Sequence, residues 1–134
     1  MRKLYSAVSN PYKQYRTTSI QTASPAKLLL MLYEGLIVFI KRGKQEVESG
    51  NPVQAHISIV KAQDILTELM GNLNMEYPIS QNLLQLYDYM KQRLVAANIK
   101  KDTDMLDEVL TFAEELRDTW AQAAKITRGR EAEI

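Results

Sequence analysis

The sequence has 134 residues and contains no cysteine, which excludes disulfide bonds, thiol catalysis and thiolate metal sites. It has a single histidine, His56, and valine stands three residues before it, so the paired Glu-x-x-His ligands of di-iron helical bundles are absent. Its five glycines form no Walker loop, dinucleotide-binding fingerprint or nucleophile elbow. We therefore expect no metal, no cofactor and no enzyme activity.

Long hydrophobic runs are also absent. The most apolar stretch, residues 28–40, has 13 residues and includes Glu34, whereas a membrane-spanning helix needs about 20 mostly apolar residues. No acidic residue precedes Glu34, but residues 4–24 are a mixture of Tyr, Ser, Thr and Gln rather than the apolar stretch of a secretory signal. We expect a cytoplasmic protein without stable membrane insertion.

The overall charge is close to balanced, with 17 basic residues against 16 acidic ones. A protein that depends on phosphate contacts needs a strong positive field, and this sequence does not supply one. We therefore expect no binding to nucleic acid.

Four helical segments are indicated by apolar residues that recur every three to four positions and by Pro, Gly, Asn and Asp at the boundaries. The segments cover residues 25–49, 52–73, 80–99 and 103–126, with Ser80 and Asp102 as expected N-caps of the last two. Their connections are short, which favours antiparallel neighbours. The predicted fold is therefore all-α, an antiparallel up-down-up-down four-helix bundle.

The predicted bundle occupies residues 24–127 and is flanked by two segments without a core of their own. Residues 1–23 are expected to form a flexible, extended N-terminal arm, and residues 128–134 a disordered C-terminal tail.

Gly43 lies inside the first helix, where glycine costs roughly 1 kcal/mol relative to alanine. Close approach of a neighbouring helix is the usual compensation.

Several aliphatic residues lie on the side of their helix opposite the predicted core stripe. They are Leu30, Ile37, Ile57, Val60, Leu84 and Val95. Single exposed apolar side chains are ordinary, but rows of them on more than one helix indicate grooves that an apolar partner fills. A wide core stripe or the face of a homodimer would produce the same pattern, so both alternatives stay open.

Three stretches of the sequence resemble one known family in the same order and spacing. Residues 22–28 (Thr-Ala-Ser-Pro-Ala-Lys-Leu) and 31–35 (Met-Leu-Tyr-Glu-Gly) resemble the opening of its first helix. Residues 86–98 (Leu-Tyr-Asp-Tyr-Met, then Arg, Leu, Ala and Asn) resemble its third helix, and residues 116–120 (Leu-Arg-Asp-Thr-Trp) its ending. The family is that of the flagellar secretion chaperones FliS, and the resemblance covers about residues 10–125.

The resemblance implies a helical bundle with a mobile N-terminal arm and a defined partner. Members of the family bind the disordered C-terminal segment of flagellin, block its premature polymerisation and keep it competent for flagellar type III secretion. Arm residues of the family fold over the empty binding surface, and Tyr12 and Tyr15 match that pattern. We therefore add both tyrosines to the expected partner-binding residues.

Other partners stay open at this point. The resemblance leaves room for contacts with the flagellar export apparatus and with other flagellar regulators, and for a weak homodimer when the partner is absent. The principal alternative is a helical adaptor or chaperone for a different secretion substrate.

Overall fold

The computed structural model describes the backbone of residues 25–133 and the side chains of residues 25–126. The described chain forms four helices and contains no strand, so the predicted all-α fold is confirmed. The helices are α3 (Pro25–Glu48), α4 (Pro52–Gly71), α5 (Pro78–Lys100) and α6 (Thr103–Glu133).

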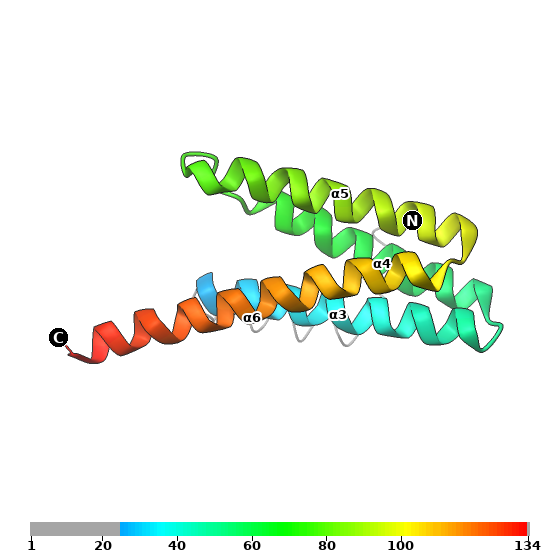
Figure 1. Cartoon of the computed structure of the whole chain (residues 1–134), viewed down its shortest axis with the longest axis horizontal. Coiled ribbons are helices and arrows are strands. Elements are labelled where there is room, and N and C mark those ends of the chain that lie inside the picture. Colours follow the sequence, from blue (N-terminus) through cyan, green and yellow to red (C-terminus); the bar gives the residue numbers. More distant parts are fainter. Residues whose placement is uncertain (1–24, 134) are drawn as a thin grey trace, which may run out of the picture.

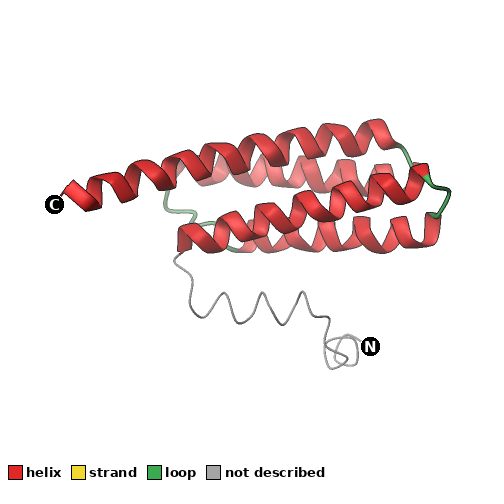
Figure 2. Cartoon of the chain, turned by 90° about the horizontal axis from the view of Figure 1, so that it is seen from below, coloured by secondary structure: helices red, strands yellow, loops and turns green. Residues whose placement is uncertain are grey.

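Each helix packs against two neighbours. Helices α3 and α5 lie diagonally opposite each other, and both contact α4 and α6. Consecutive helices run in opposite directions (Figure 1), and the C-terminal part of α6 projects beyond the end of the bundle (Figure 2). None of the helices in the described region is both long and apolar enough to cross a membrane.

The boundary residues of α5 and α6 show how the chain turns. The predicted N-cap Ser80 is wrong: α5 begins earlier, with Tyr77 at the N-cap and Pro78 at the first helical position, where proline is favoured because its missing N–H is not needed. Ser80 lies within the first turn, and its hydroxyl donates to the carbonyl oxygen of Asn74 at 2.6 Å. This bond anchors the connection between α4 and α5.

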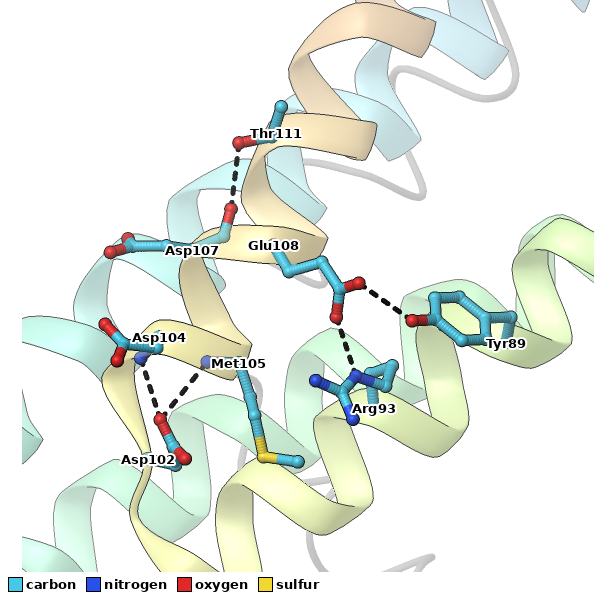
Figure 3. Close-up of polar contacts among 8 residues, drawn as sticks. All are labelled: Tyr89, Arg93, Asp102, Asp104, Met105, Asp107, Glu108 and Thr111. Atoms are coloured by element: carbon cyan, nitrogen blue, oxygen red, sulfur yellow. Dashed lines mark hydrogen bonds and ion pairs between the residues drawn. The ribbon is translucent and has the colours of Figure 1, made fainter.

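The predicted cap of α6 is confirmed. The Asp102 carboxylate oxygen Oδ1 accepts hydrogen bonds from the backbone N–H groups of Asp104 at 2.9 Å and Met105 at 3.3 Å (Figure 3). The preceding residue, Lys101, closes α5 in the left-handed conformation with φ of 51°. The reversal between the two helices therefore takes only two residues.

Helix α6 is longer than predicted. It runs to Glu133, whereas the sequence analysis ends it near Ile126 and assigns residues 128–134 to a disordered tail. The segment contains no proline, and Gly129 alone costs only about 1 kcal/mol of helix propensity. Nothing in the local sequence therefore stops the helix where it leaves the bundle.

The core lies on the bundle axis, and every helix contributes to it. Leu36, Leu66, Leu94 and Leu106, one from each helix, are at most 1% exposed. Gly43 confirms the predicted close approach, because a Cβ atom at this position would lie 2.9 Å from Cγ1 of Ile59 on α4.

Two tyrosines meet across the bundle. Tyr33 on α3 and Tyr87 on α5 are both buried, their hydroxyl groups form a hydrogen bond, and their ring centroids are 6.5 Å apart. Burial raises the pKa of both phenols, and a hydrogen-bond interaction with the Trp120 side chain opposes the rise at Tyr33. The pair joins the two diagonal helices through a polar contact inside the core.

Ile37 corrects the predicted division between core and surface. Its position around α3 predicts a site opposite the core, but Ile37 is 3% exposed and belongs to the core cluster. Helix α6 covers this side of α3, held by the Lys44–Asp107 ion pair at 2.9 Å and the Glu34–Arg117 ion pair at 3.4 Å. With two neighbours, α3 buries a wider stripe than a single core-facing row.

Candidate partner-binding surface

Exposed aliphatic side chains gather on the outer side of α4 and α5. We call this surface the α4–α5 face, defined by Val53, Ile57, Val60, Leu84, Val95 and Ile99. Val53 and Ile99 are 70% and 79% exposed, and Ile57 and Val95 are 41% and 40% exposed. Val60 and Leu84 are half-buried. The surface is therefore apolar and open to solvent in the isolated chain.

The helical period explains why these residues share one side. On α4, Val53, Ile57 and Val60 stand at positions i, i+4 and i+7, which project from the same side of a helix. The buried residues of α4, such as Ile59 and Ala62, occupy the opposite side. On α5, Val95 and Ile99 are likewise separated by four residues, with Leu84 three turns earlier.

Two hydrogen bonds fix α4 beside α5. Asn98 and His56 are joined at 2.8 Å between Nδ2 and Nδ1, and Lys91 Nζ donates to the Thr67 hydroxyl at 2.8 Å. Along α4, Val60 lies between these two contacts, and along α5, Val95 lies between them. These contacts hold Val53, Ile57 and Val60 of α4 beside Val95 and Ile99 of α5. Leu84 is separated from Val95 by Asp88 and Lys91, which lie on the same side of α5.

The hydrogen-bond roles around His56 follow from its neighbours. The Asn98 oxygen Oδ1 accepts a hydrogen bond from Lys101 Nζ at 2.6 Å, which turns the amide nitrogen of Asn98 toward His56. With this orientation the amide nitrogen of Asn98 donates to Nδ1 of His56. Across residues 25–126, no three His, Asp or Glu side chains form a group that could hold a metal.

A second set of polar contacts holds the other side of α5. The Glu108 carboxylate accepts from the Tyr89 hydroxyl at 2.7 Å and from Arg93 Nε at 2.6 Å (Figure 3). These two donors lower the pKa of Glu108. The Tyr89 ring also meets Phe112 edge-on, with centroids 6.2 Å apart. Helix α5 is therefore bonded to α6 on one side and to α4 on the other. These contacts fix the position of α5, which carries half of the α4–α5 face.

Four of the predicted binding residues lie together on this face. They are Ile57, Val60, Leu84 and Val95. The other four do not join them. Leu30 is half-buried on the flank of α3 that faces α6, two turns before Ile37, and Ile37 itself is in the core. Tyr12 and Tyr15 lie outside the residues that the structure describes.

Two members of the face are not among the residues predicted from the sequence. Val53 and Ile99 are its most exposed residues, but each lies in the terminal turn of its helix, where apolar residues attract little weight in a periodicity count. The helical spacing does indicate both residues. Val53 lies one turn before Ile57 on the same side of α4, and Ile99 lies one turn after Val95 on the same side of α5.

Comparison with known proteins shows what this bundle is related to. The family described as Flagellar protein FliS matches residues 8–127, which include α3, α4, α5 and most of α6.

The chain belongs to the FliS family.

Two curated relatives are similar along most of their length. The protein named Flagellar secretion chaperone FliS from Bacillus subtilis is 42% identical over 122 residues, covering 91% of this chain and 92% of the relative. The protein of the same name from Vibrio cholerae is 38% identical over 115 residues, covering 83% and 84% of the two chains.

The residues that carry the FliS resemblance have a structural role in this chain. Tyr33 and Tyr87, from two of the three stretches, form the buried hydroxyl pair, and Asn98 joins α5 to α4. Trp120, from the third stretch, packs against the core. These positions therefore build the FliS bundle, whereas the exposed α4–α5 face is formed by other side chains.

Proposed function

We propose that this FliS-family chain is a cytoplasmic export chaperone that binds the disordered C-terminal segment of flagellin. The observation that carries the proposal is the α4–α5 face, an exposed aliphatic surface on two helices that are locked together by hydrogen bonds. The similar proteins from Bacillus subtilis and Vibrio cholerae are named flagellar secretion chaperones.

The shape of the face suits a partner that folds as it binds. A disordered segment loses conformational entropy on ordering, so it needs a long apolar contact, typically about 1,000–3,000 Å². On α5 the face extends from Leu84 to Ile99, about 22 Å of helix at 1.5 Å per residue, with the polar residues Asp88 and Lys91 between Leu84 and Val95. An elongated strip of this kind accommodates an amphipathic helix better than a compact pocket would.

Binding at this face accounts for chaperone activity without any chemical step. The flagellin segment that packs on the aliphatic strip is withheld from other flagellin subunits, so filament growth cannot start in the cytoplasm. The same contact keeps the segment from aggregating before it enters the flagellar type III secretion pathway. The chaperone acts by covering the apolar side of the flagellin segment, and this action needs no catalytic residue.

A seeded polymerisation assay tests the proposal. Flagellin monomers are mixed with short filament seeds, and growth is followed by light scattering with and without an equimolar amount of chaperone. The wild-type chaperone is expected to suppress growth, and Val95→Lys on the face is expected to lose this effect. Ile126→Lys is the matched control, because Ile126 is an exposed aliphatic residue on α6, away from the face. Unimpeded growth with the wild-type chaperone would contradict the proposal.

A further inference from the structure

A pair of positive side chains lies over one aromatic ring where α3 meets α4. The guanidinium carbon of Arg42 is 5.6 Å from the centroid of the Phe39 ring, and Nζ of Lys61 is 5.4 Å from the same centroid. Phe39 itself is only 4% exposed. The aromatic ring attracts both cations and limits their freedom, so charges from two different helices lie beside the same ring.

Some basic side chains in the described region pair with a carboxylate, and others, among them Arg42 and Lys61, do not. Lys44, Arg93 and Arg117 each pair with a carboxylate of a neighbouring helix. In the region with described side chains, neither Arg42 nor Lys61 has a carboxylate within ion-pair distance. Glu46 and Asp64 stand one turn from Arg42 and Lys61 on their own helices, and neither forms an ion pair with them among the described contacts. A carboxylate supplied by a partner could therefore pair with both cations.

Aliphatic residues flank the cation pair along the seam between α3 and α4. The Phe39–Lys61 contact and the hydrogen bond of 2.5 Å from the Ser58 hydroxyl to Glu46 set the antiparallel register. In this register Val38 lies on one side of the pair and Ile57 on the other, and they are 40% and 41% exposed. The seam therefore presents an aliphatic residue, a double positive charge and a second aliphatic residue in a row.

We propose that this row receives a carboxylate from the flagellin C-terminal segment and so selects the register in which that segment binds. The inference rests on the proposed function. Ile57 also belongs to the α4–α5 face, so the seam is continuous with it across α4. A segment packed on the face can reach Arg42 and Lys61 without leaving the protein surface.

The spacing defines the chemistry of the bound segment. The Gly43–Ile59 contact places Ile57 level with position 45 of α3, seven residues from Val38, which is about 10 Å or two turns of a helix. The complementary segment is therefore an amphipathic helix with aliphatic residues at positions i and i+7 or i+8, and with Asp or Glu near i+4. Because the Phe39 ring already restricts both cations, less side-chain entropy is lost when the carboxylate binds.

Titration calorimetry with a peptide of flagellin's last ~40 residues, a length that suits the contact area of coupled folding and binding, tests the inference. The double variant Arg42→Gln/Lys61→Gln is expected to bind about three- to tenfold more weakly, the range for losing two exposed ion pairs. Its affinity should also depend less on salt than that of the wild type. The variant Arg42→Lys/Lys61→Arg keeps both charges and is expected to retain most of the affinity.

The control removes the same number of charges elsewhere. Lys27→Gln/Lys125→Gln changes two exposed lysines outside the seam and should leave the affinity within about twofold, since distant surface charges are largely screened. Peptide variants with single Asp→Asn or Glu→Gln changes then identify the carboxylate: one of them should weaken binding to the wild type but not to Arg42→Gln/Lys61→Gln.

The outcomes separate this inference from the proposed function. If the wild type binds the peptide and Arg42→Gln/Lys61→Gln binds it equally well, the cation pair has no part in recognition and the inference fails alone. A wild-type chain that does not bind the peptide overturns the proposed function, and this inference with it. Circular dichroism melting of each variant shows that a loss of affinity does not come from unfolding.

Discussion

The hydroxyl pair between Tyr33 and Tyr87 gives the sharpest test of how the bundle is stabilised. Both side chains are at most 1% exposed, so neither hydroxyl can turn to bulk water when its partner is removed. Tyr33→Phe leaves the Tyr87 hydroxyl buried without this partner, and Tyr87→Phe does the same to Tyr33. The double change to phenylalanine removes both polar groups and keeps both rings.

The expected free energies differ between the three variants. An unsatisfied buried hydroxyl costs about 1–3 kcal/mol, whereas replacing both partners by apolar groups of the same shape is nearly neutral. Tyr33 also interacts with the Trp120 side chain, so Tyr87→Phe leaves the Tyr33 hydroxyl with one remaining contact. We expect Tyr33→Phe to cost more than Tyr87→Phe, and the double variant to cost less than the two single costs added together.

Urea unfolding followed by far-ultraviolet circular dichroism measures these costs as shifts in the midpoint at constant slope. The prediction is a coupling free energy of at least about 1 kcal/mol between the two changes, within the range for residues in direct contact. Strictly additive single costs would refute the reasoning, because they would mean that the two hydroxyl groups do not depend on each other.

Two further predictions follow from packing and from charge. Gly43→Ala should destabilise the protein by about 1–2 kcal/mol despite the better helix propensity of alanine, because its Cβ would lie 2.9 Å from Ile59. At Gly71 an added Cβ atom would meet nothing within 4 Å, so Gly71→Ala should stabilise the protein by up to about 0.5 kcal/mol. The urea unfolding midpoints of the two variants measure both effects. Equal midpoint shifts for Gly43→Ala and Gly71→Ala would refute the crowding argument. Glu108→Gln should lower the melting temperature at pH 7, since the lowered pKa of Glu108 reflects favourable contacts of the ionised form. That contribution is present above the ordinary glutamate pKa of about 4.3 and disappears as the pH falls through the lowered value. The melting temperatures of wild type and variant should therefore converge in strong acid, and a difference that grows there would contradict this assignment.

The sequence predicts the helices well where a local signal marks their ends. Pro25 and Pro52 begin helices at the expected positions, and Asp102 caps α6 as predicted. The start of α5 is missed because Pro78 at the first helical position outweighs Ser80 as a boundary. The extension of α6 beyond Ile126 is missed because frayed ends are a general expectation rather than a property of these residues.

The candidate surface is predicted in part, for a reason that lies in bundle geometry. A helical wheel gives the angle of a side chain around its own helix but not the positions of the neighbouring helices. Ile37 and Val95 both lie off the central stripe, yet Ile37 is only 3% exposed and Val95 is 40% exposed. Tyr33 is missed as a core residue for the same reason. Only the packing of the four helices distinguishes these cases.

The measurement that tests the central claim most directly is titration calorimetry of flagellin's last ~40 residues, a length chosen for coupled folding and binding, with the wild-type chain and with Ile57→Lys. Ile57 is 41% exposed, so lysine should leave the melting temperature within a few degrees, as expected for surface changes. The account predicts tight binding to the wild type, with a negative heat-capacity change from apolar burial, and binding to Ile57→Lys that is weaker by about tenfold or more. Ile126→Lys should bind like the wild type. Equal affinity of all three proteins for the peptide would contradict the assignment of the α4–α5 face as the flagellin-binding surface.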